Sequence, residues 1–211
     1  IIWAIARKYK SIIKNFFENI DKSAYCYFPS DFFQKSLLNS IMIQTDDFID
    51  LLFSSYQIIY PNIFSPKLID SVLSKTCCYQ KFIVAKNIVQ KTLLQNPKYD
   101  FSNVFINAVK SNSLEFCKYI IDNKLYIDYY KLSSYFNEIK NVNEETFSLF
   151  INNIPPLIKH LFIEDGLSNA IENKNIHLIK YLFDQGANCD DCLFIAIEAH
   201  DIELVNLILE Y

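Results

Sequence analysis

The sequence predicts an all-α solenoid, in which about seven helix-turn-helix units stack side by side along the chain. Three observations support this prediction: one phrase recurs along the chain, apolar residues recur in it at helical spacing, and turn residues are scarce. Only two glycines and six prolines occur among 211 residues. Because β-hairpins depend on such residues, an all-β fold is a poor match.

The predicted units, taken in order, start at residues 1, 37, 68, 105, 135, 167 and 193, and they form one array over 1–211. Each unit places a small residue in its first helix. The expected small residues are Ala4, Ser40, Ser71, Ala108, Glu138, Ala170 and Ala196, of which Glu138 is the poorest match. The third unit needs an insertion around residues 77–82, and Pro155-Pro156 indicates an irregular break.

The clearest copies are 105–124, 167–186 and 193–211. In the first of them, residues 105–111 and 114–123 are expected to form two short helices joined by a tight turn. On the second helix of each copy, three aligned positions are expected to be buried. The residues at these positions are Leu114, Ile176 and Ile202 at the first, Cys117, Ile179 and Val205 at the second, and Ile120, Leu182 and Ile208 at the third. Two such helices cannot bury their stripes alone, whereas stacked neighbours can.

The phrase resembles the ankyrin repeat, most closely in "DQGANCDDCLFIAIEAHDIELVNLIL", residues 184–209. Gly186-Ala187-Asn188 corresponds to the closing Gly-Ala-Asp of that family, and residues 202–205 correspond to the start of its second helix. The resemblance is good over 105–123 and 167–211 and fair over 1–20 and 37–54. It implies binding of a partner protein on a concave face built from first helices and loops.

The chain also departs from the ankyrin pattern. No Thr-Pro-Leu-His motif occurs, and Asn112, Lys174 and His200 stand where the family has a turn glycine. Asn and His tolerate the left-handed backbone region better than most residues do. The link from Gly186 to Leu193 is short, so the protruding β-hairpin is expected to be reduced or absent. The predicted array is therefore one of degenerate, hairpin-poor ankyrin-like repeats.

The composition argues against several function classes. Two glycines are too few for a dinucleotide-binding or Walker-type phosphate loop, and a net charge of −4 argues against nucleic-acid binding. No apolar run reaches the roughly 18 residues that span a bilayer. We therefore expect a non-enzymatic protein with no cofactor, no small-molecule substrate, no nucleic-acid partner and no membrane association.

The six cysteines are irregularly spaced, which favours a reducing, cytoplasmic location over a disulfide framework. Cys189 and Cys192 form a C-x-x-C motif, but no second such motif follows to complete a zinc site. Cys192 is instead expected to begin a buried stripe. The adjacent Cys77 and Cys78 and the aligned Cys117 are also interpreted as helix or core residues.

The histidines and acidic pairs give no catalytic pattern. His160, His177 and His200 lie in different units, with no accompanying nucleophile motif. The acidic pairs 46–47 and 144–145 are expected to begin second helices, where carboxylates favour the helix dipole.

The residues expected to bind a partner are Lys110, Ser111, Glu172, Asn173, Glu198 and Ala199 on first helices, with Asn188, Asp190 and Asp191 at a loop tip. This mixed, slightly acidic surface suits a partner protein of basic or mixed character. The aromatic-rich segment 124–136 has two interpretations, a thicker core or an interface with exposed tyrosines.

The chain opens with Ile1 and stops within a repeated phrase at Tyr211, so we expect a fragment of a longer protein. One alternative function is the adaptor or regulatory arm of a larger enzyme, such as a ubiquitin-ligase substrate receptor or a host-directed effector. Another is a different helical solenoid, of the HEAT or tetratricopeptide kind, that binds peptide or RNA. That solenoid predicts helices of about 15 residues, whereas stripes of roughly seven to ten residues favour the ankyrin-like interpretation.

Overall fold

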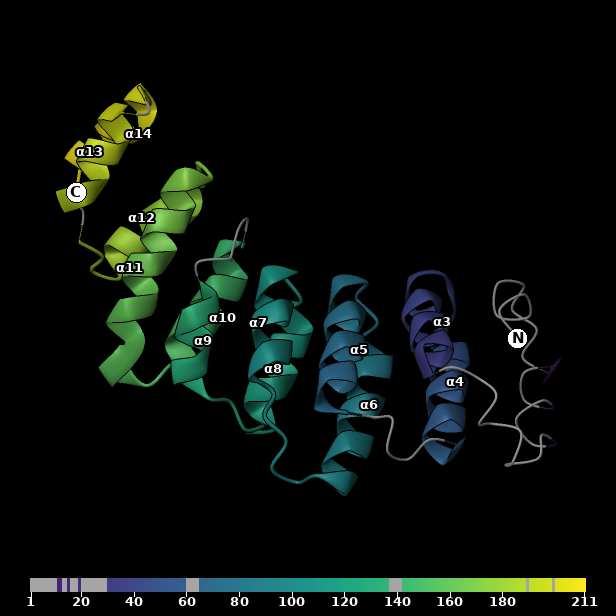
Figure 1. Cartoon of the computed structure of the whole chain (residues 1–211). Helices are drawn as coiled ribbons and strands as arrows, with labels where there is room; N and C mark the ends of the chain where they lie inside the picture. The colour runs from purple at the N-terminus through teal and green to yellow at the C-terminus, as the bar shows by residue number, and fades with distance from the viewer. Residues whose placement is uncertain are drawn as a thin grey trace. The chain divides into compact units, whose positions relative to one another are not determined.

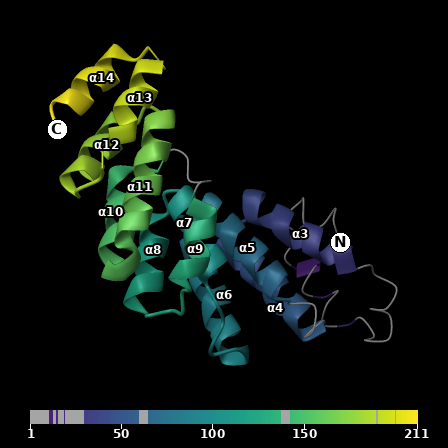
Figure 2. The same ribbon diagram turned by 60° about the vertical axis from the view of Figure 1, so that its left-hand side comes forward.

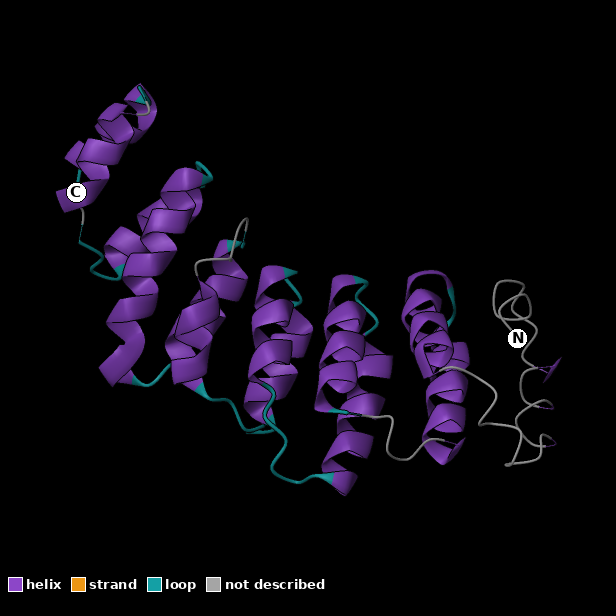
Figure 3. Cartoon of the chain, viewed as in Figure 1, coloured by secondary structure: helices purple, strands orange, loops and turns teal. Residues whose placement is uncertain are grey.

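A computed structural model describes residues 11–12, 15, 19, 30–59, 65–136, 142–188, 190–198 and 200–211. Every regular element in these ranges is an α-helix, and they contain no strand (Figure 3). The predicted all-α class is confirmed for this part of the chain. The predicted small residues Ala4 and Glu138 lie outside it.

The chain divides into two compact units, residues 1–99 and residues 100–211. Described helices of the first unit are α3 (Ser30–Ile43), α4 (Asp46–Ile59), α5 (Pro66–Cys78) and α6 (Phe82–Gln95). In this unit α3 packs on α4 and α5, and α6 packs on α5 and α4 (Figure 1). The described part of this unit therefore contains two helix pairs that lie side by side.

Local sequence explains where the helices of the first unit begin. The Ser65 side chain accepts a hydrogen bond from the Leu68 amide at 3.3 Å, and Pro66 occupies the first turn of α5. Both are favourable at a helix start, since the first amides lack helical partners and proline has no amide hydrogen to lose. Asp46 and Asp47 lie in the first turn of α4, as predicted.

The described residues of the second unit form four consecutive helix pairs. Its helices are α7 (Ser102–Lys110), α8 (Leu114–Asp122), α9 (Tyr129–Phe136), α10 (Glu144–Asn153), α11 (Pro156–Glu172), α12 (Ile176–Asp184), α13 (Asp190–Glu198) and α14 (Ile202–Leu209). The first helices form one row, in which α9 packs on α7, α11 on α9 and α13 on α11 (Figure 2). In the second row α10 packs on α8 and α12 on α10.

Aromatic rings fill the core between the central pairs of the second unit. Phe150 lies 5.7 Å from Phe105 and 5.3 Å from Phe162, measured between ring centroids. Phe147 lies 6.2 Å from Phe150 in an edge-on arrangement. These rings are at most 1% exposed, so they bury large apolar areas in favourable tilted and edge-to-face geometries.

The three alanines predicted to lie at close helix approaches are buried. Ala108 and Ala196 are 0% exposed and Ala170 is 2% exposed. Ser40, their expected counterpart in the first unit, is also 0% exposed. A larger side chain at such a position displaces the neighbouring helix, because helical interiors are closely packed.

The small residue expected to be buried in the first helix of the third unit, Ser71, was the wrong residue. Ser71 is exposed on α5, whereas Thr76, five residues later, is 0% exposed. The helix continues to Cys78, so the stretch around 77–82 holds the end of α5 and its turn rather than an insertion within a helix. The helix ends where Gln80 adopts a left-handed φ of 52° and the Lys81 amide donates to the Thr76 carbonyl at 2.8 Å.

Two other expected boundaries differ from the structure. Residue 135 lies near the end of α9, which begins at Tyr129, so it does not open a first helix. The break expected at Pro155-Pro156 is confined to the junction of two helices, because Pro156 opens α11. The ring of proline presets the backbone angle that the first turn of a helix needs.

The expected stripe on the second helices is correct at Cys117 and Ile179 and at its last positions, whereas Val205 is half-buried and the first positions are wrong. Ile120, Leu182 and Ile208 are buried, but Leu114 and Ile176 are half-buried and Ile202 is 75% exposed. The buried residues near the starts of these helices are Phe116, Leu178 and Leu204. The misplaced residues are the first in short helices, where the side chain lies beside the turn rather than between helices.

Candidate functional site

The tight turn within each of three pairs in the second unit has the same backbone geometry. Asn112, Lys174 and His200 have φ angles of 52°, 53° and 52°. In the sequence comparison, these residues stand where ankyrin repeats have a turn glycine. Gln80 has the same φ, 52°, in the first unit. The left-handed region is strained for residues that carry a Cβ, so the surrounding bonds must hold these turns.

Those bonds recur from pair to pair. The amides of Ser113, Asn175 and Asp201 donate to the carbonyls of Ala108, Ala170 and Ala196 at 2.9, 2.9 and 3.0 Å. This is the long hydrogen bond of the Schellman motif, which closes a helix on a left-handed residue. The buried alanine therefore has two functions: it permits close packing, and its carbonyl anchors the turn.

The residue that follows each left-handed residue is the N-cap of the second helix. The side chains of Asn175 and Asp201 accept hydrogen bonds from the amides of Leu178 and Leu204 at 3.2 and 3.1 Å. Asn143 does the same at the start of α10, accepting from Thr146 at 2.8 Å. These N-caps explain the polar break in each phrase, because Asn and Asp satisfy amides that have no helical partner.

Side chains also link neighbouring turns across the stack. The Asn112 side-chain oxygen accepts from the Asn143 amide at 2.7 Å, and Asn175 donates to the Val142 carbonyl at 3.1 Å. The Lys174 ammonium lies 2.7 Å from the Asp201 carboxylate. We name the turns at 111–113, 142–143, 173–175 and 200–201 the inner-turn edge. The bond with Asp201 raises the pKa of Lys174 and lowers the pKa of Asp201.

Five of the residues predicted to bind a partner lie at this edge or at the helix ends beside it. Lys110, Glu172 and Glu198 are the last residues of α7, α11 and α13. Glu172 and Glu198 are exposed and Lys110 is half-buried. Ser111 and Asn173, which follow the first two, are half-buried and donate to backbone carbonyls of their own helices at 2.7 and 2.8 Å. Ala199 lies outside the described residues.

The other three predicted residues lie elsewhere. Asp190 and Asp191 begin α13, so eight helical steps, or about 12 Å of rise, separate Asp190 from Glu198. Asn188 precedes that helix, is exposed, and donates its amide to the Glu164 carboxylate at 3.2 Å. The structure therefore places the loop tip and the inner-turn edge at opposite ends of α13. The side chains of Asp190 and Asp191 are outside the described residues.

The cysteines and histidines do not assemble into a described site. Cys192 is 6% exposed and Cys117 is 0% exposed, as their assignment to the core predicted. Cys77 is buried, Cys78 is exposed, and Cys189 lies outside the described residues. His160, His177 and His200 are all exposed. Within the described ranges, no three His, Cys, Asp or Glu side chains are arranged to hold a metal ion.

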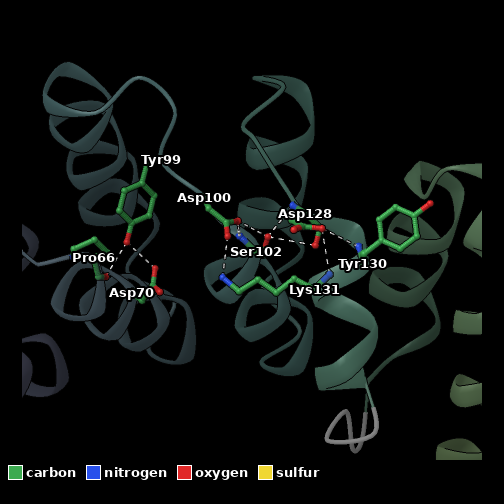
Figure 4. Close-up of polar contacts among 8 residues, drawn as sticks. All are labelled: Pro66, Asp70, Tyr99, Asp100, Ser102, Asp128, Tyr130 and Lys131. Atoms are coloured by element: carbon green, nitrogen blue, oxygen red, sulfur yellow. Dashed lines mark hydrogen bonds and ion pairs between the residues drawn. The ribbon is translucent and has the colours of Figure 1, made fainter.

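A polar cluster at the opposite ends of the helices was not predicted. The Lys131 ammonium lies 2.8 Å from the Asp100 carboxylate, which accepts from the Ser102 amide at 2.9 Å (Figure 4). The Asp128 amide donates to the Ser102 hydroxyl at 2.8 Å. Burial alone raises the pKa of Asp100, but its bonds from Lys131 and Ser102 outweigh burial and lower it. This cluster joins the segment before α7 to the start of α9.

In the first unit a tyrosine makes a comparable link. The Tyr99 hydroxyl lies 2.7 Å from the Asp70 carboxylate and 2.8 Å from the Pro66 carbonyl oxygen (Figure 4). It therefore ties the segment after α6 to the start of α5. The Asp-x-Ser spacing of Asp100 and Ser102, which the prediction from sequence did not use, is a signal for a local turn, because short polar side chains bond to amides two residues on.

The aromatic-rich segment 124–136 contains both buried side chains and exposed tyrosines. Tyr126 and Tyr130 are 58% and 69% exposed. Tyr129 is half-buried, and burial raises the pKa of its phenol. Leu132 is 0% exposed. The segment therefore contributes to the core and also presents two tyrosines to solvent.

Across the described ranges, no helix is both long enough and apolar enough to cross a membrane. Comparisons of the chain with protein-family models, with curated proteins and with solved structures returned no match.

Proposed function

We propose that the chain is a non-enzymatic protein-interaction scaffold, built from degenerate, hairpin-poor ankyrin-like repeats in a reducing, cytoplasmic setting. The observation that carries the proposal is the recurring turn of the second unit. A buried alanine is followed four positions later by a left-handed residue at Ala108–Asn112, Ala170–Lys174 and Ala196–His200, and the amide of the next residue donates to the alanine carbonyl. Stacked units of this kind create extended binding surfaces.

The proposed contact surface is the inner-turn edge with the helix ends beside it. Lys110, Glu172 and Glu198 occupy the same position in their pairs, so a partner that follows the stack meets them in turn. Links such as Lys174–Asp201 hold the edge in place. A preorganised edge loses little conformational entropy on binding. Its mixed, slightly acidic charge suits a partner protein with a basic or mixed patch.

The test is capture of a partner by the 211-residue chain, compared with three variants, Lys110→Glu, Glu172→Lys and Glu198→Lys. A specific partner that all three variants release, with unchanged circular dichroism, supports the proposal. The matched controls are Glu115→Lys and Lys118→Glu, two exposed charges on α8. If these controls release the partner equally, or the three variants retain it, the inner-turn edge is not the binding surface.

One observation favours a second candidate for the first unit. Its four described helices contain 14, 14, 13 and 14 residues, close to the length expected for a HEAT or tetratricopeptide solenoid. Such a solenoid binds peptide or RNA. Binding that weakens steeply with added salt indicates RNA, because phosphate contacts release counterions. Binding to the first unit that is insensitive to salt favours a peptide.

A further inference from the structure

The two compact units of the chain carry net charges of opposite sign. Residues 1–99 contain twelve Lys and Arg against seven Asp and Glu, a net +5, whereas residues 100–211 contain eight against seventeen, a net −9. The excess of the first unit lies in one helix pair, since residues 65–98 contain six lysines and a single acid, Asp70. Such a local charge on an acidic chain restricts which partners the surface attracts.

Two lysines of this pair are bound to the second helix of the preceding pair, α4. The ammonium of Lys81, the N-cap of α6, lies 3.2 Å from the Asp46 carboxylate. The Lys91 ammonium donates to the Ser54 hydroxyl at 2.6 Å and lies 5.5 Å from the centroid of the Phe53 ring. These two lysines therefore join α6 to α4, and they do not account for the charge that the pair presents to solvent.

The lysines of α5 lie on its solvent-facing stripe. Lys67, Ser71 and Lys75 are spaced four apart, so they share one face of the helix. Lys67 and Ser71 are exposed and Lys75 is half-buried, with α3 and α6 both packed on α5. Lys67 lies in the first turn, which contains no acid and where the helix dipole disfavours a cation. Helix stability therefore does not account for Lys67.

The helices α3 and α5 pack side by side in matching register. The Ser40 hydroxyl donates to the Leu37 carbonyl, and the Thr76 hydroxyl donates to the Leu73 carbonyl, both at 2.6 Å. All four residues are 0% exposed. A shift of 36 residues therefore relates the faces of the two helices.

The solvent-facing stripe of α3 adds a third cation. With the shift of 36 residues, Lys35 corresponds to Ser71 and Asn39 to Lys75, and both Lys35 and Asn39 are exposed. The two stripes therefore lie on the same side of this helix row. We name Lys35, Asn39, Lys67, Ser71 and Lys75 the basic face.

The acid of this helix pair is already bound. Asp70 is half-buried, and its carboxylate accepts a hydrogen bond from the Tyr99 hydroxyl at 2.7 Å. The side chain of Asp31, in the first turn of α3, is outside the described residues. The basic face thus offers three ammonium groups, a hydroxyl and an amide, which together attract carboxylates and donate hydrogen bonds to them.

The charge distribution favours an acidic protein segment over a nucleic acid as the ligand. A nucleic acid carries a charge on every phosphate, so its backbone also meets the field of the second unit, whose net charge is −9. A short acidic segment is affected only by nearby groups, because salt screens charges beyond about 8 Å. None of the five residues of the basic face is aromatic, whereas binding sites for single strands stack bases on aromatic rings.

We propose that the basic face binds an extended, carboxylate-rich segment of a partner protein. Lys67 and Lys75 are separated by about 12 Å of helical rise. Acidic residues four apart in an extended segment are about 13 Å apart, so one segment reaches both lysines. This inference rests on the peptide-binding candidate proposed for the first unit, and it names the surface and the chemistry of the peptide.

The test measures fluorescence anisotropy of a labelled decapeptide of alternating glutamate and serine, titrated with the 211-residue chain in low-salt buffer. The same peptide with glutamine in place of glutamate is the matched control. We expect the acidic peptide to bind and the glutamine peptide not to bind. Lys35→Glu and Lys67→Glu should each weaken binding at least about threefold, because each replaces an attraction by a repulsion.

Two further variants control for charge and folding. Gln90→Glu on α6 and Lys118→Glu on α8 add negative charge at exposed positions away from the basic face, so both should leave binding unchanged. Lys67→Glu places an acid in the first turn of α5, where the helix dipole favours it. Loss of binding in Lys67→Glu is therefore not explained by unfolding, and circular dichroism checks this.

The proposal is overturned by equal binding of the two peptides, by binding of neither, by binding that survives Lys67→Glu, or by equal losses in the two controls. A uridine hexanucleotide, matched to the acidic peptide in charge, provides the nucleic-acid arm. If it binds more tightly than the peptide and Lys67→Glu releases it, the ligand is a nucleic acid and the proposal is also overturned. Because Lys110→Glu and Glu172→Lys leave the basic face intact, failure of the inner-turn edge is distinguishable from failure of this inference.

Discussion

The backbone of α11 passes directly over the ring of Phe147 at Gly166: a Cβ built on Gly166 would lie 2.5 Å from the ring carbon Cζ. Phe147 is 1% exposed and also packs edge-on against Tyr181, with ring centroids 6.5 Å apart. Gly166 therefore serves a packing need, since its own position is helical and demands no unusual backbone angle.

We expect Gly166→Ala to destabilise the second unit by about 1–3 kcal/mol, because the added methyl group forces a buried ring to move. The effect should exceed the gain of about 1 kcal/mol that alanine brings to a helix interior. Urea unfolding followed by circular dichroism measures the difference. The double variant Gly166→Ala with Phe147→Leu should recover part of the loss, as a double-mutant cycle shows.

The matched control is Ser168→Ala, an exposed position on the same helix. It adds helix propensity without a clash, so it should leave stability unchanged or slightly raised. If Gly166→Ala raises stability as Ser168→Ala does, the ring has room to shift and the close approach is not a constraint.

Gln80→Gly should stabilise the first unit by about 0.5–1 kcal/mol, because glycine adopts a left-handed backbone without the steric cost that a Cβ imposes. Gln80 is exposed, with a φ of 52°. The measurement is the midpoint of urea unfolding. The same change at Gln90, exposed within α6, should lower stability by about 1 kcal/mol. If both variants change stability in the same direction, the left-handed turn assigned to Gln80 is contradicted.

Asp100 should make the chain less stable in acid. Its folded pKa is lowered, so the stabilisation is present above the unfolded pKa and is lost as pH falls through the folded one. Asp100→Asn should therefore cost stability at pH 7, and the gap from the unmodified chain should close as the pH falls through the folded pKa of Asp100. Urea unfolding midpoints of both chains, measured from pH 7 into acid, test this prediction. A stability difference that persists in acid would show that the charge of Asp100 does not cause it.

Asp50 should have the opposite effect on how stability depends on pH. Burial raises its pKa, and the nearby Asp46 and Asp47 add to this, although the hydrogen bond from Asn87 and the charge of Lys91 oppose it. A raised acid pKa means that the charged form is disfavoured in the folded chain, so stability is lost as pH rises through that pKa. Asp50→Asn should raise stability at pH 7, with an advantage that vanishes in acid. Loss of stability at pH 7 would mean that the Lys91 charge dominates.

Cys117 should resist alkylation until the second unit unfolds. Burial raises the pKa of its thiol to about 12, so little reactive thiolate is present at neutral pH. Cys78, which is exposed, should react first. Peptide mass mapping after timed iodoacetamide treatment gives the order. Adding urea should bring the Cys117 rate up to that of Cys78, and rapid labelling of Cys117 in the native chain would contradict its burial.

The sequence by itself determined the local features of this protein. Polar breaks and helical spacing located the helices around 105–122, and the alignment located the turns at Asn112, Lys174 and His200. The buried alanines followed from the same alignment. These features were predictable because caps, turns and helix faces depend on residues only a few positions apart.

Only the tertiary structure decided which neighbour covers each face. Ile197 and Leu209 fit the repeated phrase as well as their buried counterparts Ile171 and Phe183 do, yet they are exposed, and no described helix pair stacks beyond them. The Asp100–Lys131 pair joins residues that the stacking of α7 and α9 brings together. A sequence pattern specifies that a helix has an apolar face, but burial depends on a second surface whose position is set by packing across the whole stack.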